Sequence, residues 1–117
     1  MRGPAEWFCG DVWIDPLATP NEHSHLNVGR VHFSPGARTA WHSHEGGQTL
    51  LVTEGHGLVQ SRGEDAVHLH AGDVHQTSDG VEHWHGAVSD QFMTHISITA
   101  GAATWGDQVT DTEYDNA

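Results

Sequence analysis

Two closely spaced pairs of histidines are the residues of this sequence best suited to chemistry. His42 and His44 are separated by one residue, and so are His83 and His85. Since alternate residues of a β-strand point to the same face, the members of each pair would project together. Gln48 follows a Gly-Gly turn and opens the next predicted strand, so its amide oxygen could return to the same space. Three imidazoles and one side-chain oxygen suit a divalent first-row transition metal.

The spacing of these histidines does not by itself distinguish a metal site from chance. The chain has 12 histidines in 117 residues, and two further pairs, His23/His25 and His68/His70, repeat the spacing. His32 should face away from any cavity enclosed by the strands. The histidines without an assigned partner are interpreted as surface residues, namely His23, His25, His56, His68, His70 and His75.

Short apolar–polar alternations separated by turn residues predict an all-β fold. Turn signals recur roughly every 8 to 12 positions, and no segment shows the apolar period of about 3.6 residues that marks an amphipathic helix. Strands this short and numerous favour a barrel or jelly-roll sandwich. The predicted strands cover 25–33, 40–44, 48–53, 58–61, 66–70, 83–88 and 92–99, with a further strand over 7–14 at an edge or exchanged with a partner subunit.

Length and charge limit the classes of protein to be considered. The 117 residues suffice for one domain, with a barrel over about 25–100, an N-terminal strand segment over 5–17 and an exposed or frayed tail over 110–117. Sixteen acidic residues against four arginines give a net charge of -12, which excludes a basic nucleic-acid surface and argues against attraction to an anionic membrane. One cysteine, Cys9, excludes an internal disulfide, and without a signal peptide or membrane span a cytoplasmic protein is expected.

The residues around the first histidine pair resemble the first motif of the cupin family. Gly36 is followed after five residues by His42 and His44, after three more by Gln48, and after six more by Gly55. Each interval fits the family pattern G(X)5HXH(X)3-4E(X)6G. The departure is Gln48, which stands where the family usually has glutamate.

A second stretch resembles the second cupin motif, G(X)5PXG(X)2H(X)3N. Gly72, Gly80 and His83 hold the expected intervals, while Ser78 replaces the proline and Ala87 the asparagine. The resemblance implies a small jelly-roll barrel whose metal ligands are His42, His44, Gln48 and His83.

Further segments are similar to the bacterial cupin-type hydroxynitrile lyases, which are manganese-dependent enzymes that cleave cyanohydrins to an aldehyde and hydrogen cyanide. The likeness implies Mn²⁺ as the expected metal, although three His and one amide also suit Fe, Co, Ni or Zn. The segments that carry it are 3–8, 14–17, 35–42, 48–50, 83–87 and 93–95.

Three residues are candidates for catalysis. His85 shares a face with His83 but has no ligand role in the motif, so it is the expected general acid/base. His95 alternates with Met93 and Ser97 and either faces the same cavity or is a core histidine bonded to the backbone. The resemblance also implies contact between Thr39 and the substrate, although strand parity would require a bulge over 37–39.

The charge of the ligand set favours one type of reaction. A neutral Gln48 leaves the site one negative charge short of the glutamate version, which keeps the metal electrophilic and favours Lewis-acid chemistry over dioxygen activation. We therefore predict a metal-dependent lyase acting on a small hydroxylated or carbonyl substrate. A cupin dioxygenase, an isomerase and a non-catalytic metal- or small-molecule-binding module remain the alternatives.

Aromatic residues are expected to pack in the core or between subunits. All five tryptophans, Trp7, Trp13, Trp41, Trp84 and Trp105, are interpreted in this way rather than as ligand stackers. The N-terminal segment also carries Phe8 and Ile14, which is more apolar bulk than an edge strand needs in a monomer. A homodimer, or a higher homo-oligomer, is the expected assembly.

Overall fold

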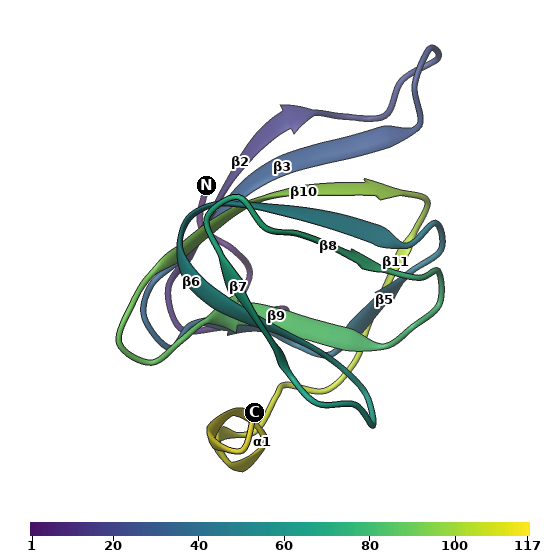
Figure 1. Cartoon of the computed structure of the whole chain (residues 1–117). Coiled ribbons are helices and arrows are strands. Elements are labelled where there is room, and N and C mark those ends of the chain that lie inside the picture. Colours follow the sequence, from purple (N-terminus) through teal and green to yellow (C-terminus); the bar gives the residue numbers. More distant parts are fainter.

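Eleven antiparallel strands wrap into a nearly closed barrel in the computed structural model, which describes residues 1–117 (Figure 1). The main path of paired strands is β1-β4-β9-β6-β10-β3-β2, and β5, β7, β8 and β11 attach to its sides. The all-β prediction is confirmed. The elements are β1 (Phe8–Cys9), β2 (Val12–Ala18), β3 (Leu26–Phe33), β4 (Arg38–Thr39), β5 (His42–His44), β6 (Gln48–Ser61), β7 (Val67–His70), β8 (Val74–Thr77), β9 (His83–Ala87), β10 (Met93–Ala100), β11 (Ala103–Trp105) and α1 (Asp111–Asp115).

The long strand β6 joins the two sides of the barrel. Its first part pairs with β8 and β10, and its last part pairs with β7 and β9. The strand bends at Gly55, where φ is +82° and a Cβ atom would collide with the carbonyl oxygen of Phe92. The pairing with β10 shifts register at the same bend, between Thr94 and His95. The two strands predicted over 48–53 and 58–61 are therefore one continuous strand with a glycine bend.

The N-terminal segment forms an edge of the sheet, as expected. The strand predicted over 7–14 divides into β1, which pairs with β4, and β2, which pairs with β3. Pro16, which has no N–H to donate, lies in β2 where the register shifts before Ala18. The other side of β2 meets the chain through an isolated bridge between Arg2 and Trp13. The β2–β3 hairpin projects from the barrel (Figure 1).

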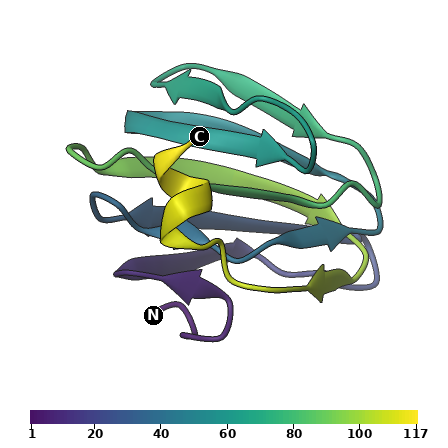
Figure 2. The ribbon, with the colours of Figure 1, turned by 90° about the horizontal axis from the view of Figure 1, so that it is seen from below.

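The C-terminal tail is mostly exposed, which is one of the two expected alternatives, but it is ordered rather than frayed. Thr110 and Glu113 form a capping box, in which each side chain accepts from the other residue's backbone N–H, and α1 begins there. The Tyr114 hydroxyl donates to the carbonyl oxygen of Ala87 at 2.6 Å. Seen from below, α1 lies across the outside of the barrel (Figure 2). The capping signal was present in the sequence, but the helix is too short to show an apolar stripe.

Two apolar clusters support the barrel. The larger one fills the interior beside the histidines and contains Val12, Val31, Phe33, Ala37, Val52, Val59, Leu69, Ala87 and Met93. The smaller one, with Trp41, Leu58, Trp84, Val88 and Val109, is covered by Tyr114 of α1. This single helix is far too short to serve as a membrane span.

Candidate metal centre and its cavity

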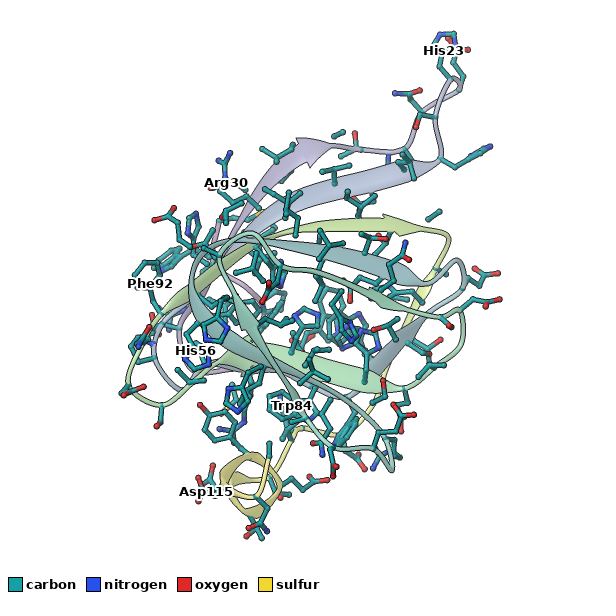
Figure 3. The ribbon with its side chains drawn as sticks, viewed as in Figure 1. His23, Arg30, His56, Trp84, Phe92 and Asp115 are labelled. Atoms are coloured by element: carbon teal, nitrogen blue, oxygen red, sulfur yellow. The ribbon has the colours of Figure 1, made fainter.

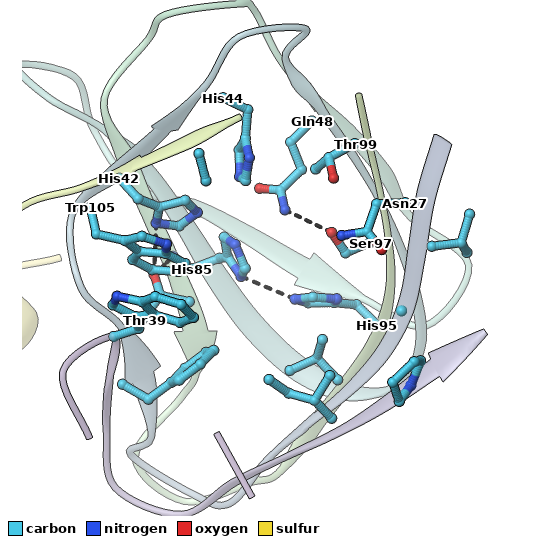
Figure 4. A pocket seen from close by; sticks show the side chains of 18 of the residues that line it. Asn27, Thr39, His42, His44, Gln48, His85, His95, Ser97, Thr99 and Trp105 are labelled. Atoms are coloured by element: carbon cyan, nitrogen blue, oxygen red, sulfur yellow. Dashed lines mark hydrogen bonds between the residues drawn. The ribbon is translucent and has the colours of Figure 1, made fainter. Parts of the chain in front are cut away.

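A cavity of about 440 Å³ opens inside the barrel and receives most of the predicted site residues. Most of its polar lining comes from β4, β5, β6, β9 and β10, with Asn27 added by β3, and most of its apolar lining comes from the N-terminal strands and β11 (Figure 4). The predicted site residues in this lining are Thr39, His42, His44, Gln48, His85 and His95. His83, the remaining predicted ligand, is not part of this lining but contacts Gln48, with its Nε2 atom 2.8 Å from the amide oxygen.

Three buried histidines could hold a metal ion. His42 and His83 are directly opposite each other in the pairing of β5 with β9, and His85 lies two residues further along β9. One ring nitrogen from each of the three lies within 4.8 Å of the others. This geometric cluster includes His85, to which the motif gives no ligand role.

Two backbone carbonyls set the tautomers of His42 and His83. The Nδ1 atom of His42 is 2.9 Å from the carbonyl oxygen of Ala40, and that of His83 is 3.0 Å from the carbonyl oxygen of Val81. Because a carbonyl oxygen only accepts, each Nδ1 carries the proton and each Nε2 keeps its lone pair. Ligating histidines in proteins are commonly oriented by such contacts.

The electrostatics of the cluster keep these imidazoles neutral. Burial, followed by the nearby His83, lowers the pKa of His42 to about 3. Burial, again followed by His83, lowers the pKa of His44 to about 4. The Nε2 atom of His44 is buried without a hydrogen-bond partner, so it too offers a nitrogen to an ion. Neutral imidazoles are the form that binds metals.

The Gln48 side chain also fits a cation. Its amide nitrogen donates to the Ser97 hydroxyl at 2.8 Å, which turns its amide oxygen toward Nε2 of His83. In this orientation the oxygen and the unprotonated nitrogen are two acceptors at 2.8 Å. A cation bound by both would remove the repulsion between them, so the donor set fits a metal ion.

His85 and His95 form a second buried pair next to the cluster. The Nδ1 atom of His85 is 3.0 Å from the Nε2 atom of His95 (Figure 4), and the ring of Phe33 packs against both. Burial lowers the pKa of His85 well below its usual value and that of His95 to about 4. The other nitrogen of each ring is buried without a partner. One proton is therefore shared in this contact, and two unpaired nitrogens remain at its ends.

Thr39 lines the cavity, but for a different reason from the one expected. Regular strand structure stops after Thr39 and resumes at His42, and this break reverses the parity so that both side chains point inward. No bulge over 37–39 is involved. The Thr39 hydroxyl oxygen accepts from the backbone N–H of His85 at 3.2 Å.

Sequence reasoning missed the aromatic wall of the cavity, which includes two stacked tryptophans and Phe8. Trp105 stacks on the ring of His42, with 4.5 Å between ring centroids, and Trp7 stacks on Trp105 at 4.9 Å. The tryptophans were expected to pack in the core or between subunits. Trp41 and Trp84 are buried in the core, whereas Trp7 and Trp105 line the cavity. Trp105 lies in a three-residue strand opposite His42, which is too short for alternation to reveal.

The remaining histidines lie outside the cavity. The outward position of His32 is confirmed, since its side chain contacts the Thr94 hydroxyl beyond the lining. His75 is half-buried and lies close enough to His83 to contribute, after burial, to the lowered pKa of His83. It is therefore not a simple surface residue. The exposed group comprises His23, His25, His68 and His70, and His56 is half-buried.

Comparisons with known proteins agree with this architecture. The cupin domain family matches residues 29–99. The chain is 45% identical to an (R)-mandelonitrile lyase of Granulicella tundricola, over 97% of this chain and 89% of that protein. A cupin-like protein of Thermotoga maritima is 44% identical, with a TM-score of 0.96 over 99% of this chain and 91% of the other. A predicted oxalate decarboxylase of the same organism shares the fold, with 22% identity and a TM-score of 0.77 over 87% and 91% of the two chains.

Proposed function

Because the chain belongs to the cupin family, we propose that it is a metal-dependent lyase that cleaves and forms hydroxynitriles. The identity to a protein named as an (R)-mandelonitrile lyase extends over nearly the whole chain. The cavity volume of about 440 Å³ is typical of small-molecule sites. Its aromatic wall, formed by Trp7, Phe8 and Trp105, suits a substrate with one aromatic ring. The substrate class we propose is therefore an aromatic cyanohydrin.

We assign the metal to His42, His44, Gln48 and His83. Their free nitrogens and the Gln48 amide oxygen form a neutral donor set, and Mn²⁺ is the ion we propose. When bound, the ion supplies a Lewis acid that polarises the substrate oxygen.

The single observation that carries the catalytic assignment is the unpaired Nε2 atom of His85. This atom is buried beside the ligand cluster, while Nδ1 of the same ring contacts His95. Burial keeps the imidazole neutral, and in the tautomer whose Nδ1–H donates to His95 the Nε2 atom carries a free lone pair, so it can accept a proton at pH 7. His85 takes the hydroxyl proton of the cyanohydrin, the carbon–carbon bond breaks with its electron pair going to cyanide, and the aldehyde carbonyl forms. The proton then passes to cyanide from His85 or His95 as hydrogen cyanide leaves.

The Thr39 hydroxyl supports this step by position. It accepts from the backbone of His85 and also lines the cavity, so its proton is free to donate to the substrate oxygen. Phe33 excludes water from behind the two histidines. These contacts hold the proton carrier in place before the substrate arrives.

The experiment that tests the proposal is release of cyanide and benzaldehyde from mandelonitrile by Mn²⁺-loaded protein. Turnover above that of metal-stripped protein supports the lyase. Absence of cyanide release with Mn²⁺, Fe²⁺, Co²⁺, Ni²⁺ or Zn²⁺ overturns it. Oxygen consumption in the same assay would indicate dioxygenase chemistry instead.

We also propose that the protein works as a cytoplasmic homodimer. Trp13 and Leu17 on the edge strand β2 each expose 48% of their surface. A second copy packing against this edge would bury both side chains and cover the part of β2 after Ile14, which residues 1–3 do not pair. Cys9 is free, as suits a reducing compartment.

A further inference from the structure

We infer that a second divalent-metal site lies on the outer surface of the barrel, at His56, His68 and His70. His56 belongs to β6 and lies directly opposite His70 of β7, while His68 is two residues along the same strand. The three side chains therefore share one face of the β6–β7 ribbon. This site is separate from the cavity and does not depend on the proposed lyase function.

The contact between His56 and His68 suits coordination of one ion. The Nε2 atom of His56 is 2.8 Å from the Nδ1 atom of His68. Zinc binds histidine nitrogens at about 2.0–2.1 Å, so two such nitrogens at a tetrahedral or right angle lie roughly 2.9–3.4 Å apart. A shift of a few tenths of an ångström would therefore let His56 and His68 bind the same ion. The ring of His70 stacks on that of His56 with 4.3 Å between centroids. Its exposed side chain supplies a third nitrogen by rotating about its own bonds.

The backbone under the cluster is held on several sides. The N–H of His56 donates to the carbonyl oxygen of Phe92, and its own carbonyl oxygen accepts from Val88. The N–H of His70 donates to the Asp73 carboxylate at 2.8 Å. Ligands on such a platform lose little freedom when an ion binds.

The charges around the cluster favour a cation. The Asp73 carboxylate lies 3.9 Å from Nδ1 of His70, and its negative charge favours a bound cation. The whole chain has a net charge of -12. Imidazole ligands select borderline ions such as Zn²⁺, Ni²⁺ and Cu²⁺ over Mg²⁺ or Ca²⁺. Zn²⁺ is therefore the ion with which to test the site.

This cluster lies outside the cavity. Figure 3 places His56 on the bend of β6, at the end of the barrel away from β5 and β11. None of the three histidines lines the cavity. The two sites can therefore be emptied independently by substitution.

The test is equilibrium dialysis of metal-stripped protein against Zn²⁺ at pH 7.5, with metal per chain measured by elemental analysis. We expect two bound equivalents in the parent and in the control His23→Gln, which changes an exposed histidine of the β2–β3 hairpin. His68→Gln should lose one equivalent, or bind it at least about tenfold more weakly, and His42→Gln should lose the other. Because His68 is exposed, its substitution leaves the fold intact, which circular dichroism verifies.

The outcomes separate the two sites. Equal Zn²⁺ binding by His68→Gln and the parent, or equal losses in His68→Gln and His23→Gln, overturns the surface site. Loss in His68→Gln without any loss in His42→Gln supports the surface site and contradicts the metal assignment of the cavity. Long-range ¹H–¹⁵N spectra of the imidazoles provide a second measurement, since Zn²⁺ should shift the ring nitrogens of His56 and His68 and leave those of His23 unchanged.

Discussion

Replacing His85 with alanine should separate metal binding from catalysis. The substitution removes the imidazole that we assign to proton transfer and leaves the four proposed ligands untouched. Losing one proton-transfer group costs about 10²- to 10⁴-fold in rate, or roughly 2.7–5.4 kcal/mol of transition-state stabilisation. It also removes the partner of the buried Nε2 atom of His95, at a cost to folding of about 1–3 kcal/mol. The variant should therefore fold, melt at a lower temperature and keep its metal.

The assay follows benzaldehyde formation from mandelonitrile by ultraviolet absorbance, with the metal content of each sample measured in parallel. His95→Ala should lose less activity than His85→Ala, because proton abstraction is assigned to His85 alone, whereas either residue can return the proton to cyanide. The outward-facing His32→Ala is the matched control and should retain the parent's kcat/KM.

Two results would refute this reasoning. Turnover by metal-loaded His85→Ala equal to that of the parent removes His85 from the mechanism. Loss of the metal together with the activity identifies His85 as a ligand instead, a role that its distance to His42 and His83 permits.

Three other measurements bear on the site and the assembly. His83→Ala or His42→Ala should lower metal content sharply and reduce the metal-dependent rise in melting temperature, since an ion stabilises only the state that binds it; unchanged stoichiometry in both would reject the ligand assignment. In metal-free folded protein the pKa of His42 is about 3 and that of His95 is about 4, both below the value of 6.5 in the unfolded chain. The contribution of these two histidines to folding stability is therefore complete above pH 6.5 and declines as the pH falls toward their folded pKa values. At pH 5 the two together should have lost about 4 kcal/mol of unfolding free energy relative to pH 8, and urea titrations that show no loss between these pH values would contradict their buried, neutral state. Sedimentation equilibrium at micromolar concentration should give the mass of two chains, and a single-chain mass would exclude the dimer.

The convergence of the predicted ligands could be anticipated because it depends on local geometry. The one-residue spacing of His42 and His44 needs only strand parity, and the glycine turn before Gln48 returns the chain to the same face. The structure brings the histidine pair and Gln48 close to His83, the arrangement that the two motifs implied. The alternation likewise predicted most strands, since one face of each packs on the core.

The features that were missed depend on contacts between distant segments. The side on which Thr39 points is decided by a break after it, where the N–H of Ala40 donates to Trp7 and that of Trp41 donates to Asp107. Neither partner is near in sequence, so strand parity could not supply the answer. The short strands β8 and β11 were overlooked for the same reason, because pairing with β6 and β5 defines them rather than their own composition.

The stacking of Trp7 on Trp105 has a consequence for how the protein acquires its metal. This wall joins segments separated by nearly the whole chain, and Gln108 strengthens the junction by donating to the carbonyl oxygens of Ala5 and Glu6. Contacts of such long range carry a large loop-closure cost and tend to form late in folding. The histidines of the cavity come from the middle of the chain and can assemble earlier. We therefore expect an ion to enter the cavity before the wall of Trp7 and Trp105 has formed. Refolding in the presence of Mn²⁺ should then load the protein faster than adding Mn²⁺ after refolding, and equal loading rates would contradict this order of events.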